Sequence, residues 1–111
     1  MIELVVITIR ARQLNSWSDK SKGLLGSTKP ENVYFKTRWG VHTFFMKFAI
    51  DVVILDRRNV VVNTFQNLKP WKIFLWNPKF NQVLELPQGT VTKLGLNKGN
   101  KVALIFTSAY F

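Results

Sequence analysis

The stretch that most constrains the fold is Ile50–Leu55, whose residues IDVVIL are apolar on both faces of an extended chain except at Asp51. Such a run is typical of an interior strand that is covered on both sides. A turn, Asp-Arg-Arg-Asn at residues 56–59, follows it, and a second apolar run, Val60–Phe65, comes next. The asparagine in this turn tolerates a left-handed backbone. Together these segments predict a β-hairpin whose first strand is buried.

The remainder of the chain also has the pattern of short strands. β-branched or alternating residues predict strands at Ile2–Arg10, Val33–Arg38, Asn81–Leu86 and Lys101–Thr107. A short helix is expected between the last two, because Pro87 suits a helix start and Gly95 suits a helix end. A second short helix is expected within residues 16–26. The predicted fold class is strand-dominated α+β, a compact and mostly antiparallel sheet or partly open barrel with two short helices.

Length and composition fit a single domain, residues 1–111, because 47% of the residues are hydrophobic and can form a core. The chain has no cysteine, which excludes disulfides, thiolate metal sites and cysteine nucleophiles. This composition fits the reducing cytoplasm, which is the expected location. The first residues, MIELVVITIRARQ, have no basic region or small-residue cleavage site, so a strand is expected there and not a signal peptide. No apolar stretch approaches the ~20 residues of a membrane span.

The formal net charge is +10, so the protein is strongly basic. A positive field favours contact with nucleic acid, anionic membranes or acidic proteins. The cations are scattered, however, and no block of five like charges forms a basic tail. Nucleic-acid binding is therefore not favoured as the primary function, and any such binding is expected to be weak and electrostatic.

Three groups of residues together resemble one known family. They are Gly23-Leu24-Leu25, His42-Thr43-Phe44-Phe45-Met46 with Ile50-Asp51, and Val83-Leu84-Glu85-Leu86-Pro87 with Gly89. In this combination the chain, from about Ile2 to Thr107, resembles domain-of-unknown-function family 192, a bacterial and archaeal family of small uncharacterised domains. The resemblance implies a compact β-rich domain and no established activity. The chain departs from the family pattern at Ala49, Gln88 and Asn100, where proline, alanine and aspartate are usual.

His42, Asp51 and Glu85 are the candidate catalytic residues, for a small acid/base hydrolase or transferase. Both acids have apolar neighbours, and burial raises the pKa of a carboxyl group. The stronger interpretation is structural, because a buried acid commonly accepts backbone hydrogen bonds or pairs with a cation. Asp51 in particular is expected to be buried and hydrogen-bonded. No metal or cofactor is expected, because one histidine without cysteine makes a poor zinc site.

Lys69, Trp71, Lys72 and Trp76 are the candidate ligand-binding residues. Aromatic rings interleaved with cations suit stacking against single-stranded bases or sugar rings, and they also suit a hydrophobic flap over a sheet. The family resemblance at Leu68-Lys69-Pro70-Trp71 favours a fixed structural turn, since proline pins the backbone. Upstream, alternation along an expected strand places Phe44 and Phe45 on opposite faces, with at least one of them in the core.

These observations favour a non-catalytic binding or accessory module whose ligand is an unknown small molecule or protein. The module is expected to be cytoplasmic and monomeric. Two alternatives remain open, namely an acid/base enzyme that uses His42, Asp51 and Glu85, and a weak electrostatic nucleic-acid binder. A convergent polar pocket would favour the first alternative, and a continuous basic face with exposed tryptophans would favour the second.

Overall fold

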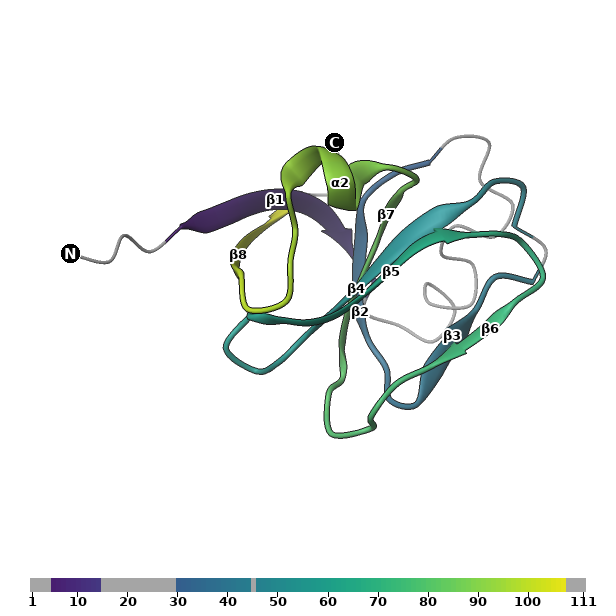
Figure 1. Cartoon of the computed structure of the whole chain (residues 1–111), viewed down its shortest axis with the longest axis horizontal. Coiled ribbons are helices and arrows are strands. Elements are labelled where there is room, and N and C mark those ends of the chain that lie inside the picture. The colour runs from purple at the N-terminus through teal and green to yellow at the C-terminus, as the bar shows by residue number, and fades with distance from the viewer. Residues whose placement is uncertain (1–4, 15–29, 45, 108–111) are drawn as a thin grey trace.

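The structure is a computed structural model, and it describes residues 5–14, 30–44 and 46–107. Six strands form one curled sheet in the order β5-β4-β7-β2-β1-β8 (Figure 1). They are β1 (Val6–Gln13), β2 (Val33–Lys36), β4 (Ile50–Leu55), β5 (Val61–Leu68), β7 (Gln82–Pro87) and β8 (Lys101–Thr107). β1 runs parallel to β2 and β8, whereas the β2–β7, β7–β4 and β4–β5 pairs are antiparallel.

The two edge strands of this sheet meet at one corner. Val60 forms an antiparallel bridge with Lys101, next to the first residue of β5. The amide of Val61 donates to the carbonyl of Asn100 at 2.9 Å, and the amide of Val102 donates to the carbonyl of Asn59 at 2.9 Å. The sheet is therefore a half-barrel with one closed corner, and the predicted strand-dominated, partly open barrel is confirmed.

One hydrophobic cluster fills the inside of the half-barrel. Its members come from both edge strands and from every strand between them: Ile9, Ala11, Tyr34, Val53, Leu55, Val61, Leu84, Leu86, Val91, Leu96 and Val102. Two of these residues, Val91 and Leu96, belong to or follow α2 (Thr90–Leu94), which packs against β4 and β7. Gly89 and Gly95 flank α2 with φ of 89° and 66°, left-handed values that glycine adopts without strain. At five residues α2 is too short to cross a membrane, and the described part of the chain holds no longer helix.

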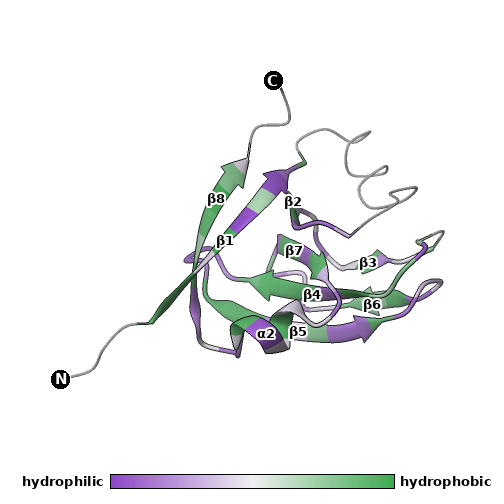
Figure 2. Ribbon diagram, turned by 90° about the horizontal axis from the view of Figure 1, so that it is seen from above, coloured by the Kyte–Doolittle hydropathy of each residue, from purple (hydrophilic) through white to green (hydrophobic). Residues whose placement is uncertain are grey.

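A second cluster lies on the outer face of the same strands, beneath a small ribbon. The ribbon consists of β3 (Gly40–His42) and β6 (Ile73–Leu75), which pair antiparallel and lie side by side at one end of the molecule (Figure 1). Half-buried Val41 and Phe74 of the ribbon pack on this outer cluster, which includes Val52 and Val83. Because β4 lies between the two clusters, all six of its residues are buried, and Figure 2 shows β4 as mostly hydrophobic.

Most of the expected elements are found, and the differences are local. Ile50–Leu55 and Lys101–Thr107 are strands with the predicted bounds, while the first described strand is shifted toward Gln13. The helix before Gly95 is present but starts at Thr90, after the turn at Gly89. The second expected helix, in residues 16–26, lies outside the described residues.

The expected strand through residues 42–46 is wrong. β3 ends at His42, and the chain then turns, with the amide of Met46 donating to the carbonyl of Thr43 at 3.2 Å. The rings of His42 and Phe44 stack with their centroids 4.9 Å apart, and Phe44 is only half-buried. Phe45 lies outside the described residues.

Asp51 is fully buried and hydrogen-bonded, as predicted. One carboxylate oxygen, Oδ2, accepts the amide of Val91 in α2 at 2.9 Å, and the other, Oδ1, accepts the amide of Asn67 at 3.1 Å. Asn67 has a left-handed φ of 56°, and the β4–β5 register shifts between Ile50 and Val52, opposite this point. The carboxylate therefore joins an irregular part of β5 to the first turn of the helix.

We expect Asp51→Ala to lower the free energy of unfolding by about 2–4 kcal/mol, because the buried amide of Val91 and the partly buried amide of Asn67 lose their acceptor. Asp51→Asn keeps one carbonyl oxygen and should cost less. Urea denaturation of both variants measures the difference, with Asn63→Ala on the exposed side of β5 as a control. An alanine variant as stable as the wild type would contradict this role.

Candidate functional site

The three acid/base candidates occupy different parts of the molecule. Asp51 pairs with Leu86, a member of the cluster inside the half-barrel. Glu85 pairs with Val52 and Val33, both members of the outer cluster. Because side chains on one face of a sheet stay in register across it, the two carboxyl groups point to opposite faces. His42 is exposed on the separate ribbon, so the described residues do not bring the three together.

Glu85 is an acid buried against apolar side chains. Its exposed fraction is 9%, and its neighbours across the sheet are Val33 and Val52, neither of which is exposed. Burial disfavours the charged form and raises the pKa of Glu85 to about 7. The carboxyl group of Glu85 therefore gains or loses its proton near neutral pH. It does not share a site with His42 or Asp51.

The four ligand-binding candidates also separate. Trp76 is 7% exposed, and its indole Nε1 donates to the carbonyl of Phe80 at 2.8 Å, so Trp76 is a core residue. Trp71 is 59% exposed, with a left-handed φ of 68°. Lys69 and Lys72 are exposed on either side of it. Three of the four candidates thus lie on the surface beside the ribbon, and the fourth supports the core below.

Thr43 holds the loop that carries Trp71. It is fully buried, and its hydroxyl donates to the carbonyl of Lys69 at 2.6 Å and accepts the amide of Lys72 at 2.9 Å. Its backbone amide donates to the carbonyl of Lys72 at 2.8 Å, and its carbonyl accepts the amide of Trp71 at 2.9 Å. These four bonds fix the two loops against each other. This role is not predicted from the sequence, in which the only signal is a threonine among apolar residues.

The outward side of the ribbon is unusually apolar. We call it the ribbon face, and its members are His42, Phe44, Trp71, Ile73 and Leu75, together with exposed Trp39 directly before β3. His42 pairs with Ile73 and Gly40 pairs with Leu75, so these four residues share one side while Val41 and Phe74 point to the core. The exposed fractions are 66% for Trp39, 62% for Ile73 and 70% for Leu75. Large apolar side chains are therefore exposed on this short ribbon.

Two local features hold the side chains of the ribbon face in position. A Cβ atom at Gly40 would lie 2.3 Å from the carbonyl oxygen of Phe74 and 2.7 Å from Cδ2 of Leu75, so only glycine allows this close approach. At the other end, the rings of His42, Phe44 and Trp71 form a continuous stack with centroid distances of 4.9 and 5.9 Å. Ring stacking and backbone contact together hold these side chains in fixed positions.

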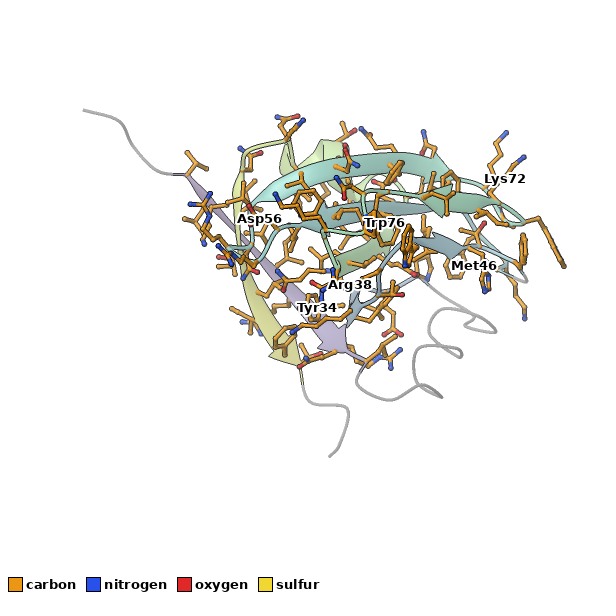
Figure 3. The ribbon with its side chains drawn as sticks, turned by 90° about the horizontal axis from the view of Figure 1, so that it is seen from below. Tyr34, Arg38, Met46, Asp56, Lys72 and Trp76 are labelled. Carbon is orange, nitrogen blue, oxygen red and sulfur yellow. The ribbon has the colours of Figure 1, made fainter. Side chains whose placement is uncertain are left out.

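The charge around the ribbon face is positive. Its segments, residues 38–48 and 69–76, contain Arg38, Lys47, Lys69 and Lys72 and no aspartate or glutamate. Figure 3 shows Lys72 at the ribbon end of the molecule, far from Asp56 at the opposite end. The segments that build the ribbon face therefore carry cations and no acid, although the guanidinium of Arg38 turns to the carbonyl of Pro78.

Comparison with known proteins places the chain in a family. Residues 6–104 match DUF192, described as "Uncharacterized ACR, COG1430". The chain belongs to the DUF192 family. This membership confirms the resemblance drawn from the sequence motifs, and it assigns no activity, since the family is uncharacterised.

Similar DUF192 relatives include proteins of two archaea. A UPF0127 protein of Pyrococcus abyssi is 37% identical over 73 residues, which cover 64% of this chain and 62% of that protein. A UPF0127 protein of Pyrococcus horikoshii is 34% identical over 62 residues, covering 56% of this chain and 53% of that protein. The chain thus spans less than two thirds of the length of these relatives.

Two solved structures have a similar fold. One is a protein of unknown function from Novosphingobium aromaticivorans, with a TM-score of 0.69 and 20% identity over 85% of this chain and 71% of that chain. The other, described as a putative transcription regulator from Sinorhizobium meliloti, also has a TM-score of 0.69 and 20% identity, over 88% of this chain and 79% of that chain. At this identity the likeness shows the fold alone.

The raised pKa of Glu85 predicts how stability depends on pH. The folded pKa of about 7 lies above the ordinary value of 4.5, so the folded chain holds the proton more tightly than the unfolded chain. The free energy of unfolding should therefore fall by roughly 3 kcal/mol as the pH rises from about 4.5 to about 7. Above that pH it should level off.

Replacing Glu85 with glutamine removes this titration, so the variant should lose the decline. Urea denaturation of wild type and Glu85→Gln at about pH 5 and about pH 8 measures the contribution of this one group. An equal decline in both proteins would mean that other groups cause the pH dependence. It would contradict the raised pKa of Glu85.

Proposed function

We propose that the protein is a cytoplasmic, single-domain, monomeric binding module without catalytic activity, and that its ribbon face docks on another protein. The observation that carries the proposal is the exposure of Trp39, Trp71, Ile73 and Leu75, between 59% and 70%, with exposed Lys69 and Lys72 on either side of Trp71 in the sequence. Tryptophan and other large apolar side chains in a central, rigid patch dominate the energy of protein interfaces. The expected partner surface is apolar with acidic residues beside it, because Lys69 and Lys72 are exposed next to Trp71 and the segments of the ribbon face contain no acid.

Rigidity supports this proposal. Thr43 ties the Trp71 loop to the loop after β3, and Gly40 sets the position of Leu75 against the ribbon backbone. A surface that is ordered before binding loses less conformational entropy when a partner covers it. The four large side chains are therefore presented at low entropic cost.

A protein partner fits the face better than nucleic acid does. Bases stack on aromatic rings, whereas the middle of the ribbon face carries the aliphatic side chains of Ile73 and Leu75. Trp76, one of the two rings expected to form a base platform, is buried. The placement of Asp51 and Glu85 on opposite faces of the sheet likewise favours binding over acid/base catalysis.

A displayed library of random peptides, selected on the immobilised protein, tests the proposal. Enriched peptides should combine large apolar residues with aspartate or glutamate. Their affinity, measured by fluorescence anisotropy, should fall by about 30-fold in Leu75→Ser, which corresponds to roughly 2 kcal/mol. Ile105→Ser, an exposed aliphatic residue on β8, is the matched control and should change the affinity little.

Three outcomes would contradict the proposal. One is enrichment that is equal on the Leu75→Ser protein. A second is salt-resistant binding to single-stranded oligonucleotides that is lost in Trp71→Ala, which would favour nucleic acid instead. A third is a dimer in light scattering that dissociates in Leu75→Ser, which would make a second copy of the chain the occupant of the ribbon face.

A further inference from the structure

A cleft of about 430 Å³ lies between two turns, away from the ribbon face. Asp56, Arg57 and Arg58 of the β4–β5 turn line one side, and Lys79, Phe80 and Asn81 before β7 line the other. Its volume falls in the range of small-molecule sites, about 300–1,000 Å³. Three cations and one carboxylate give the lining a net positive charge.

The β4–β5 turn is held by its own polar groups. Oδ1 of Asp56 accepts the amides of Arg58 at 2.8 Å and Val60 at 3.0 Å, so the one carboxylate of the cleft is engaged with the backbone. Gln82 donates to the carbonyl of Asp56 and to the side chain of Asn59. These bonds fix the turn backbone, from which the exposed side chains of Arg57 and Arg58 extend.

The opposite turn is held in the same way. Oδ1 of Asn77 accepts the amide of Lys79 at 3.0 Å, and the carbonyl of Phe80 accepts the indole of Trp76 at 2.8 Å. Arg38 donates to the carbonyl of Pro78 at 2.6 Å. The Nζ atom of Lys79 lies 5.8 Å from the centre of the Phe80 ring. The two walls of the cleft are therefore built on fixed backbone.

No salt bridge joins the cations of the cleft to an acid among residues 5–14, 30–44 and 46–107, although Arg58 interacts electrostatically with Asp56. The salt bridge found in that part of the chain joins Arg12 to Glu31, on other segments. Like charges held beside a concave surface repel one another and create a positive potential that attracts anions. Arginine also binds phosphate in a bidentate manner, through two parallel N–H donors.

We propose that this cleft binds the phosphate group of a small phosphorylated molecule. Arg57 and Arg58 supply forked N–H donors, and Lys79 supplies a point charge. Phe80 and Asn81 line the wall beside them. The site is independent of the ribbon face. In Figure 3, Asp56 of the cleft and Lys72 of the ribbon lie at opposite ends of the molecule.

An NMR titration of the ¹⁵N-labelled protein tests the site, with pyrophosphate, ADP and adenosine as separate probes at low ionic strength. Pyrophosphate or ADP should cause saturable shifts of the amides in residues 56–60 and 79–82, and adenosine should cause none. Arg57→Ala combined with Arg58→Ala should weaken the affinity by at least about tenfold. ADP and pyrophosphate distinguish a nucleotide ligand from an inorganic one.

The matched control is Arg10→Ala combined with Lys36→Ala, which removes two exposed cations outside the cleft and changes the net charge equally. This control should alter the affinity by less than about twofold, since long-range charge is screened. Equal loss in both double variants, shifts spread over the whole basic surface, binding of adenosine, or no shift with either phosphate probe would each overturn the proposal. Retained amide spectra of both double variants establish that they are folded.

Discussion

The carboxylate of Asp51 joins β4 to α2 and to β5 through hydrogen bonds. It accepts an amide from α2 and an amide from the irregular stretch of β5, and it is fully buried inside the half-barrel. α2 begins at a glycine that makes no side-chain cap, so this acid of β4 supplies the acceptor for its first turn. The attachment of α2 to β4 therefore depends on a polar residue as well as on the inner hydrophobic cluster.

The sequence predicted the strands and the helix that depend on residues close together in the chain. Ile50–Leu55 was recognised as an interior strand because both faces are apolar, and the burial of Asp51 followed from that pattern. The faces of Asp51 and Glu85 could not be predicted, since they depend on which residue stands opposite each one in the sheet. Register and strand order come from contacts far apart in sequence, including the closure of the half-barrel at Val60 and Lys101.

Thr43 and the two tryptophans show a second limit of local reasoning. Alternation alone extends a strand through residues 42–46, but the buried hydroxyl of Thr43 gains two hydrogen bonds by turning toward the Lys69–Lys72 loop. Trp71 and Trp76 are close in sequence and alike in chemistry, yet their exposed fractions are 59% and 7%. The ribbon decides this difference, because Trp71 lies in the loop before β6 and Trp76 follows β6 over the core.

In both proposed binding surfaces, a small polar side chain holds the backbone of a turn. Thr43 beside the ribbon and Asp56 beside the cleft are small polar residues whose side chains bind the backbone of a turn at more than one point. Once the turn is fixed from within, its large neighbours are exposed: Trp71 at one end, Arg57 and Arg58 at the other. The chain thus buries both acids of its central strands, and the two proposed binding surfaces lie on exposed turns and on the exposed ribbon.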